Sequence, residues 1–481
     1  MTDAARANRL VIGLLLVSTF VVILNETIMG VALPRLMHDL RITATTGQWL
    51  TAGFMLTMAV VIPVTGFLLQ RFTTRTMFVW AMGLFSTGTL IALLAPGFPV
   101  LLVGRVVQAS GTAIMMPLLM TTVLALVPPA HRGRVMGNIS IVISVAPAVG
   151  PTISGLILNA LPWRAMFGLV LPIALAALIV GALLVRNISE PRRIPLDVPS
   201  IVLSAVAFGG VVYGLSSIGT AGSAGLLQPV ASIAIGAVAF VVFVRRQRRL
   251  ERRDAALLDL RTFSVRSFSV SMVAMSISMI GMFGTLILLP IYLESVLGLS
   301  VLTVGLLLLP GGLLMGLLSP VVGRIYDRRG PRILAIPGAV LVSAVLWGLA
   351  TVGTHTTVWF VLGAHIVLSI ALALTFTPLF TSALGGLTPN LYSHGSALVG
   401  AGQQLAGAAG TALFVTVLAI GTGLAAGHGS DIASATAAGV RTAFLFGAII
   451  SVGGIVASCF VHRPIEPVSA PDAVEAPVLA H

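Results

Sequence analysis

Long apolar runs alternate with short polar segments along almost the whole chain. An α-helix rises 1.5 Å per residue, so a run of about twenty apolar residues crosses a hydrocarbon core roughly 30 Å thick. Windows of this length predict fourteen transmembrane helices, although Pro290 and Pro310 interrupt the hydrophobicity of 267–325. The helices are predicted near residues 10–33, 46–69, 76–95, 99–127, 134–158, 164–185, 198–218, 226–244, 267–292, 303–325, 332–353, 357–384, 394–422 and 439–461.

The longest charged connection, residues 245–266, divides the chain near its middle. Leu257, Leu258 and Phe263 stand among its arginines. It could therefore lie as an amphipathic helix on the inner leaflet, or it could be a solvated topological anchor. Two halves separated in this way are typical of transporters built from repeated helical bundles.

Composition places these helices in a membrane. The 481 residues are 57% hydrophobic and only 9% charged, too few charges to cover a soluble protein of this size. All 27 basic residues are arginine, and the formal charge is +13. No basic face is interleaved with aromatic residues, so we expect no nucleic-acid partner. The single cysteine, Cys459, excludes an internal disulfide and a cysteine metal cluster.

The arginines set the predicted orientation. Most lie in alternate connections, which the positive-inside rule assigns to the cytoplasm. These arginines include Arg71, Arg75, Arg132, Arg134, Arg186 and those of 245–254 and 324–332. The opposite connections hold Arg35, Arg41, Arg164 and Arg441. With an even number of helices, both termini are predicted to be cytoplasmic, and the first apolar run is too long for a cleaved signal.

The first helix carries a carboxylate at the depth of the hydrocarbon core. Asn25 and Glu26 follow an apolar run that extends from Leu10 to Leu24. An ionised group there costs several kcal/mol unless it faces a watery cavity, has a partner or binds a proton. We predict that Glu26 is the proton-coupling acid and that Asn25 and Glu26 contact substrate. The alternative is a structural acid that never titrates.

Other polar residues also lie within the predicted helices. Arg105 needs a counter-charge or a polar cavity, so it is predicted either to take part in proton coupling or to pin helices together. His365 is interpreted as a hydrogen-bonded core residue. Four residues are further candidates for substrate contact, with cross-helix bonding or a solvated rim as the alternative roles. They are Gln108, Glu294, Gln403 and Gln404.

Two loops share one pattern, which indicates an internal repeat. Residues 66–75 read GFLLQRFTTR and residues 323–332 read GRIYDRRGPR. The second loop resembles the signature G-x-x-x-D-R-x-G-R-R of the major facilitator superfamily, and the first has Gln70 at the acid position. In that family the acid bonds across helix ends and latches the cytoplasmic side closed. The resemblance implies gating roles for Gly66, Arg71, Arg75, Gly323, Asp327, Arg328 and Gly330.

The fourth and fifth helices resemble two further motifs of the same superfamily. The stretch LLVGRVVQASG resembles the fourth-helix motif whose arginine, here Arg105, is associated with proton coupling. The run APAVGPTISG at 146–155 permits bending and close packing, and it resembles the antiporter motif associated with export. Ala146 and Ser154 replace two of its glycines. We assign to this motif Pro147, Gly150, Pro151 and Gly155.

Two longer stretches narrow the resemblance, which covers nearly the whole chain. LNETIMGVALP in the first helix and LPIYLESVLGLSVLTVGLLLLPGG in the ninth and tenth resemble the fourteen-helix branch of drug:proton antiporters. That branch exports quaternary ammonium compounds, lincomycin and quinolones. Many of its members have aspartate where Asn25 stands. The acid here lies one residue later, about 100° around the helix.

This resemblance implies an all-α membrane protein with the major facilitator fold, in which two six-helix bundles are joined by two inserted helices. We expect substrate to bind at mid-depth between the bundles. The expected parts are an N-terminal bundle in 1–190, the inserted helices in 191–245, a cytoplasmic arginine-rich loop in 246–266, a C-terminal bundle in 267–461 and a cytoplasmic tail in 462–481.

The predicted function is proton-coupled efflux of hydrophobic, neutral or monocationic drugs by a monomer in a bacterial cytoplasmic membrane. No HExxH, GxSxG or P-loop motif occurs, so we expect neither enzyme activity nor a cofactor or metal. One alternative is a dedicated exporter of a single endogenous metabolite, lipid or peptide. A channel or a membrane enzyme is the alternative of another class, and sodium could replace the proton.

Growth of a drug-susceptible bacterium that expresses the chain separates the first two readings. We expect resistance to several chemically unrelated hydrophobic compounds, because a wide apolar site selects weakly among them. Resistance confined to one compound or its close analogues would favour the dedicated exporter.

Overall fold

The computed structural model describes residues 3–188, 191, 195–218, 225–427, 429 and 431–463. In this part of the chain the regular elements are all helical, and fourteen helices are long and apolar enough to cross a membrane, which confirms the prediction. The bounds are α1 Asp3–Leu40, α2 Ala44–Arg71, α3 Thr74–Leu94, α4 Phe98–Leu126, α5 Arg132–Ala160, α6 Arg164–Leu184, α7 Val198–Ile218, α8 Leu227–Glu251, α9 Arg266–Ser295, α10 Val301–Arg329, α11 Arg332–Leu349, α12 Val358–Gly385, α13 Tyr392–Gly427 and α14 Ile432–Cys459. Short 3₁₀ helices are η1 Pro129–His131, η3 Leu260–Ser264 and η4 Pro389–Leu391.

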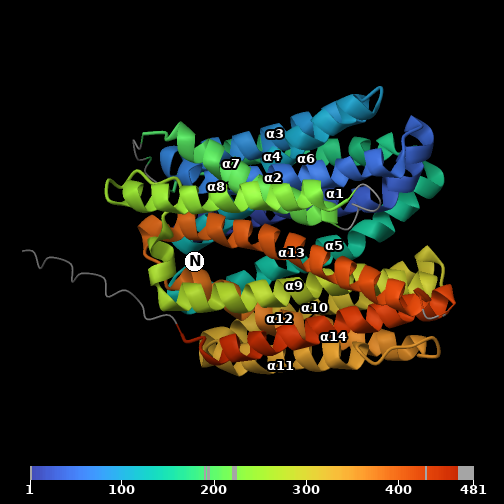
Figure 1. Cartoon of the computed structure of the whole chain (residues 1–481). Helices are drawn as coiled ribbons and strands as arrows, with labels where there is room; N and C mark the ends of the chain where they lie inside the picture. The colour runs from blue at the N-terminus through green and yellow to red at the C-terminus, as the bar shows by residue number, and fades with distance from the viewer. Residues whose placement is uncertain are drawn as a thin grey trace, which may run out of the picture.

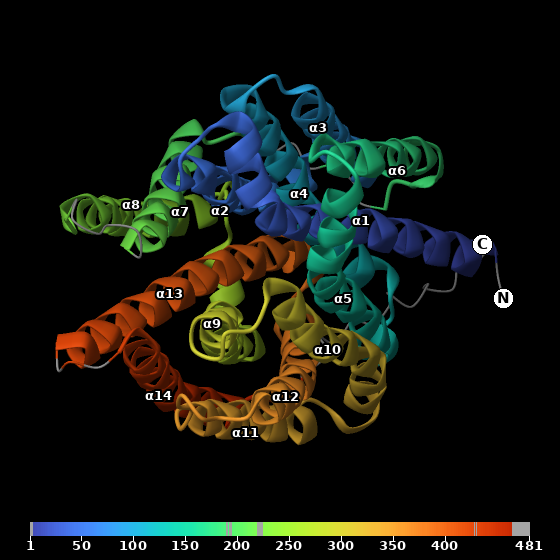
Figure 2. The ribbon, with the colours of Figure 1, turned by 90° about the vertical axis from the view of Figure 1, so that its right-hand side faces the viewer.

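The helices form two groups. Figure 1 shows α1–α4 and α6–α8 in one half of the molecule and α9–α14 in the other, with α5 beside α13 between them. In the end view of Figure 2, α5 and α13 lie between the groups, and the inserted pair α7–α8 lies at one side, beside α2. The chain therefore forms a six-helix bundle, a two-helix insertion and a second six-helix bundle, the fold class predicted above.

The boundary between α9 and α10 is set by the chain between them and not by the two prolines. Pro290 and Pro310 lie inside α9 and α10. The helices are separated by residues 296–300, where Gly298 has a φ of +68° and Ser300 caps α10 by accepting the Thr303 N–H. Membrane helices tolerate proline because neighbouring groups satisfy the freed backbone.

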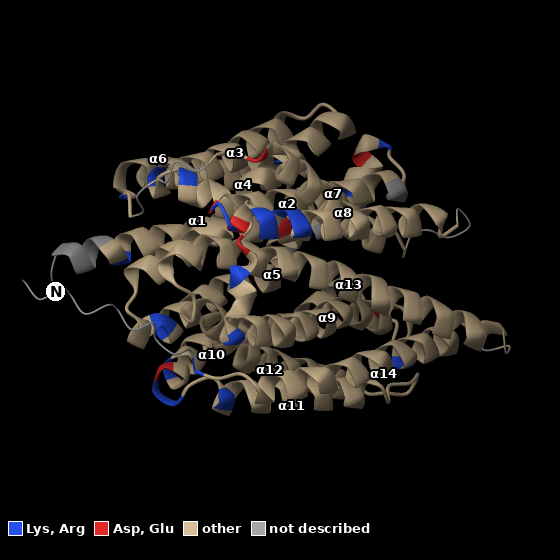
Figure 3. Ribbon diagram, turned by 60° about the vertical axis from the view of Figure 1, so that its left-hand side comes forward, with Lys and Arg blue, Asp and Glu red and all other residues tan. Residues whose placement is uncertain are grey.

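Arginines gather at one end of the bundles, which is called the arginine-rich end below. At this end α2, α8 and α10 finish and α5 and α11 begin. Figure 3 shows basic residues around these ends of α5, α8, α10 and α11. The sequence predicts that this end is cytoplasmic.

The two groups approach each other closely where α5 crosses α10. A Cβ atom on Gly133 or on Gly323 would overlap the backbone of the other helix, and one on Gly137 would overlap the backbone at Ser319. The hydrophobic effect does not drive helices together in lipid, so they associate through van der Waals packing, and small residues allow their backbones to approach closely. The crossing therefore depends on glycine at these positions.

The inserted helices are fastened together by an ion pair at the arginine-rich end. Asp197, just before α7, accepts hydrogen bonds from Nε and Nη2 of Arg246 on α8, both at 2.7 Å. It also accepts the Ser200 N–H at 3.2 Å. The hydrogen bonds from the Arg246 side chain lower the pKa of Asp197 to about 2. The pair therefore stays ionised at neutral pH.

The segment after α8 packs into the protein. Gln247 is fully buried, and its Oε1 accepts the N–H groups of Leu257 at 2.8 Å and Leu258 at 3.2 Å. The side chains of both leucines are buried in the protein. Residues 256–259 are thus buried inside the protein, where Gln247 supplies partners for two backbone N–H groups, whereas Arg252 and Arg253 are exposed. The first residues of the arginine-rich stretch, through Glu251, belong to α8.

Asp197→Asn should lower the midpoint of thermal unfolding by about 1 °C, because it removes the charged hydrogen bonds that join α7 to α8 at this partly exposed site. The pKa of Asp197 is lower in the folded state than the value of about 3.9 expected when unfolded. This contribution is therefore present above that value and is lost as the pH falls toward 2. Thermal unfolding of the detergent-purified protein at several pH values measures both effects. Asp39→Asn, at an exposed acid of α1, is the control, and an equal loss in the control would contradict the assignment.

Candidate functional site

The polar stretch of α1 packs directly against the glycine-containing run of α5. Thr27 Oγ1 donates to Leu24 O at 2.9 Å and reaches Ala146 O on α5 at 3.5 Å. Ser154 Oγ donates to Ile28 O at 3.0 Å. A Cβ atom on Gly150 would overlap the Thr27 hydroxyl. The structure thereby joins two motifs that the sequence places more than a hundred residues apart.

Glu26 lies within this contact region and is partly buried. Its carboxylate forms no hydrogen bond or ion pair with the described residues, but it interacts electrostatically with Arg105 on α4 over a longer distance. The neighbouring Asn25 is 4% exposed, and its Nδ2 has no hydrogen-bond partner in the described structure. Two polar side chains on one turn of α1 are thus available to a proton, water or ligand.

Arg105 is held in the interior of the first bundle and is 1% exposed. Its Nη1 donates to Gln108 Oε1 at 2.6 Å, and its guanidinium lies 4.2 Å from the centre of the Phe54 ring. Gln108 Nε2 in turn donates to Thr89 Oγ1 on α3 at 2.7 Å. Gln108, predicted to contact substrate, therefore uses both ends of its amide to fix Arg105 and to join α3 to α4.

The remaining predicted substrate residues lie elsewhere. Glu294 is exposed in the last turn of α9, at the end opposite the arginine-rich end. Gln403 and Gln404 on α13 are partly buried and form no hydrogen bond with the described residues. The structure does not gather these three residues around Glu26 in one site.

The predicted antiporter residues have different surroundings along α5. Gly150 faces α1, and Pro147, almost one turn earlier, lines a cavity. The space around Gly155 is open, with no heavy atom within 4 Å of a Cβ placed there. The side chain of Pro151 is outside the described residues. The motif thus contributes both to packing against α1 and to the lining of a cavity.

A cavity that sequence reasoning missed lies between α5 of the first bundle and α9, α10 and α12 of the second. It has a volume of about 210 Å³ and a mostly apolar lining. His365 Nε2 lies 3.0 Å from Leu308 O, whereas its Nδ1 and the Ser144 hydroxyl are buried and have no hydrogen-bond partner in the described part of the chain. The sequence predicts a hydrogen-bonded core residue at His365. Its Nε2 has a hydrogen-bond partner, but its Nδ1 has none among the described residues. Ser144 gave no signal beyond lying on the same face of α5 as Pro147 and Ala148.

Comparison with known proteins identifies the family. Residues 15–411 match the family described as Major Facilitator Superfamily. The chain belongs to this superfamily. Lincomycin resistance protein LmrB of Listeria monocytogenes is 40% identical over 459 residues, which cover 94% of this chain and 96% of that protein. A multidrug resistance protein B homolog of Mycobacterium tuberculosis is 28% identical over 410 residues, covering 84% and 75%.

A solved structure shows the same fold. The proton:xylose symporter XylE has a TM-score of 0.65 with 13% sequence identity, covering 94% of this chain and 95% of that chain. As a member of the Major Facilitator Superfamily, the protein is a multi-pass membrane transporter of small molecules and not an enzyme.

In this facilitator the second signature loop caps a helix of the other bundle. Asp327, at the end of α10, accepts the backbone N–H groups of Gly133 at 2.7 Å and Arg134 at 2.9 Å. Both amides belong to the first turn of α5, where a helix leaves its N–H groups unpaired and its dipole favours a negative charge. Asp327 thus fastens the second bundle to the first at the arginine-rich end.

The first signature loop makes a neutral counterpart of this contact. Gln70, at the end of α2, donates from Nε2 to Asn390 O at 2.9 Å, in the connection before α13. An aspartate could not donate this bond. Gln70 and Asp327, which occupy the same position of the two loops, thus bond differently: Gln70 donates a hydrogen bond, whereas Asp327 accepts two.

Further hydrogen bonds join the bundles at the same end. Arg132 Nη2 donates to the Tyr392 hydroxyl at 2.9 Å, and its Nη1 reaches Gly385 O at 3.4 Å. Thr377 and Ser140 are bonded through their hydroxyls at 2.9 Å. Together with Asp327 and Gln70, these contacts join the two bundles at the arginine-rich end.

The predicted gating glycines occupy tight or turning positions. Gly66 lies against His394 of α13, and Gly323 lies against Gly133 of α5. Gly330 ends α10 with a φ of +80°, a conformation that favours glycine. Gly66 and Gly323 therefore leave little room for a side chain, and Gly330 has a backbone conformation that other residues rarely adopt.

The predicted gating arginines make weaker contacts. Arg71 lies over the Phe67 ring, 6.0 Å from its centre. The backbone N–H of Arg75 donates to Asn187 Oδ1 at 3.3 Å. Arg328 is exposed at the end of α10.

Asp327→Ala should increase opening of the arginine-rich end, because it removes two charge-assisted hydrogen bonds worth about 1 kcal/mol or more each. Gln70→Ala removes one neutral bond and should have a smaller effect, below about 1 kcal/mol. A cysteine at the buried position Ser140, in a Cys459→Ser background, reports opening through its rate of maleimide labelling. The rate should rise several-fold in Asp327→Ala. Equal rates in both variants and the unsubstituted background would contradict the capping role.

Proposed function

We propose that this facilitator exports small hydrophobic compounds, neutral or singly positive, in exchange for protons. The cycle is alternating access between two bundles, and the chain works as a monomer with both termini in the cytoplasm. The arginine-rich end is then the cytoplasmic end. The conformation described above is the one closed toward the cytoplasm.

The observation that carries this proposal is the position of Glu26. Its carboxylate lies inside a membrane helix, without a hydrogen bond to the described residues and near the buried charge of Arg105. A carboxylate there can be stabilised by Arg105 when ionised and can bind a proton when the site loses its water. Because Arg105 is fixed through Gln108, its field at Glu26 changes only when the helices move.

The geometry also supports coupling between proton and substrate. Glu26 lies next to Thr27, which contacts α5, and neighbouring residues of α5 line the cavity containing Ser144 and His365. A molecule in that cavity and a proton on Glu26 therefore act on the same helix. The apolar lining suits hydrophobic cargo, and the unpaired His365 Nδ1 and Ser144 hydroxyl offer hydrogen bonds.

The driving force is sufficient for accumulation. One elementary charge crossing 100 mV gains about 2.3 kcal/mol, equivalent to a concentration ratio of roughly 50. The relatives named for lincomycin and multidrug resistance make lincomycin the first compound to test. A dedicated exporter of one endogenous metabolite would use the same proton site and differ only in the cavity.

Glu26→Gln should abolish substrate-dependent proton movement in proteoliposomes, with a decrease of at least about tenfold, because glutamine can occupy the site but cannot carry a proton. The measurement follows internal pH after lincomycin or another resistance-conferring compound is added.

Asp39→Asn is the matched control, because Asp39 is an exposed acid on the same helix and pairs with Arg35 near its end. It should transport as the unsubstituted protein does. Full proton-driven export by Glu26→Gln would end the proposal for this residue.

A further inference from the structure

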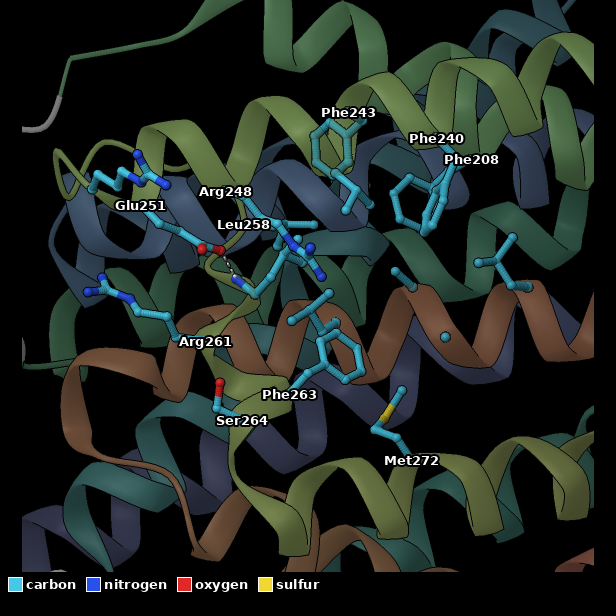
Figure 4. A pocket seen from close by; sticks show the side chains of 17 residues that line it. Phe208, Phe240, Phe243, Arg248, Glu251, Leu258, Arg261, Phe263, Ser264 and Met272 are labelled. Carbon is cyan, nitrogen blue, oxygen red and sulfur yellow. Dashed lines mark hydrogen bonds between the residues drawn. The ribbon is translucent and has the colours of Figure 1, made fainter.

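A second cavity, of about 920 Å³, lies between the inserted helices and the second bundle. Figure 4 shows its walls, which come from α7, α8, the segment after α8, α9 and α13. Helix α8 packs extensively on α7 and only touches η3, so this cavity occupies the space between α8 and α13. It is separate from the contact region of Glu26 and from the cavity lined by His365.

Most of the cavity wall is apolar and aromatic. Phe208 on α7 packs edge-to-face against Phe240 and Phe243 on α8, with ring centres 5.6 and 6.3 Å apart. Phe240 is 39% exposed and Phe263, on the opposite wall, is 44% exposed. Exposed aromatic surface along membrane helices faces lipid. The wall is thus suited to a hydrocarbon chain entering from the side.

The end of the cavity nearest the arginine-rich end is cationic. Arg248 reaches from α8 into the cavity (Figure 4), and Arg252 also lines it. Neither guanidinium forms a hydrogen bond or ion pair with the described residues. Arg261, by contrast, is paired with Asp254 and Asp259, and the Glu251 carboxylate accepts the Leu260 N–H at 2.7 Å. Arg248 and Arg252 are thus the lining arginines without an acidic partner among the described residues, while Glu251 keeps its negative charge beside them.

We propose that this cavity binds an anionic phospholipid from the surrounding leaflet. The headgroup phosphate lies at Arg248 and Arg252, and an acyl chain lies along Phe240, Phe243 and Phe263. Basic pockets between membrane helices, at the level of the headgroups, are suited to anionic lipid. The exported compounds proposed above are neutral or cationic, so the two free arginines disfavour them here.

The bound lipid completes the packing of the inserted helices. Asp197 and Arg246 fasten α7 to α8, and α7 contacts α13, but the described part of α8 makes no comparable contact with the second bundle. A lipid in the cavity fills this space and can follow the movement of either bundle during transport. It therefore connects the insertion to the moving half without a rigid protein contact.

The test follows thermal unfolding of the full-length protein in neutral detergent with phosphatidylglycerol, phosphatidylcholine or inorganic phosphate added. Phosphatidylglycerol should raise the unfolding midpoint by several degrees, and the other two should not. In Arg248→Gln/Arg252→Gln the apparent affinity for phosphatidylglycerol should fall about 10- to 30-fold, since each arginine near the surface contributes about 1 kcal/mol. Native mass spectrometry of the purified proteins provides an independent measure of retained lipid.

Arg249→Gln/Arg253→Gln is the matched control, because it removes the same charge from neighbouring exposed positions that do not line the cavity. It should keep both the stabilisation and the retained lipid. An equal loss in the control would reduce the effect to general surface charge. Equal stabilisation by phosphatidylcholine or by inorganic phosphate would also overturn the proposal, the first by removing the role of the headgroup charge and the second by removing the role of the acyl chain.

Discussion

The electrostatic relation between Glu26 and Arg105 is the constraint on which the rest of the site depends. Among the described residues, Glu26 and Arg105 share the interior of the first bundle without forming an ion pair. A direct pair would neutralise both and leave nothing to titrate, whereas isolation would make either charge too costly in hydrocarbon. Gln108 and Phe54 hold the guanidinium in place. Under the proposed function, the Glu26 carboxylate is then the group that exchanges a proton.

Helix α5 links this site to the rest of the molecule. At its start, Asp327 of the second bundle caps its unpaired N–H groups and Gly133 meets Gly323. Further along, Gly150 receives Thr27, while Pro147 and Ser144 face the cavity between the bundles. One rigid helix therefore touches the gate, the proposed proton site and the proposed cargo site. A displacement of α5 at any one of these three places would therefore change its contacts at the other two.

The inserted helices use a different kind of contact. They are fastened to each other by a charged pair and to the chain that follows by the buried amide of Gln247. Their contact with the second bundle includes a wide space lined by aromatic rings and by two unpaired arginines. Close glycine packing unites the bundles at the α5–α10 crossing, whereas this peripheral pair leaves room for a molecule supplied by the membrane.

The fourteen helices, the fold class and the family could be predicted from the amino-acid sequence, because hydrocarbon requires long apolar helices and short motifs recur at fixed places in this superfamily. Glu26 and Arg105 could also be singled out, since a charged residue within an apolar run is conspicuous. The support of Arg105 by Gln108, the exposed position of Glu294 and the bond from Gln70 to Asn390 became visible in the folded structure. The folded structure alone brought His365, Ser144 and the arginines of α8 to cavities. These roles depend on which face of each helix meets which neighbour, and apolar periodicity carries little of that information when nearly every face is apolar.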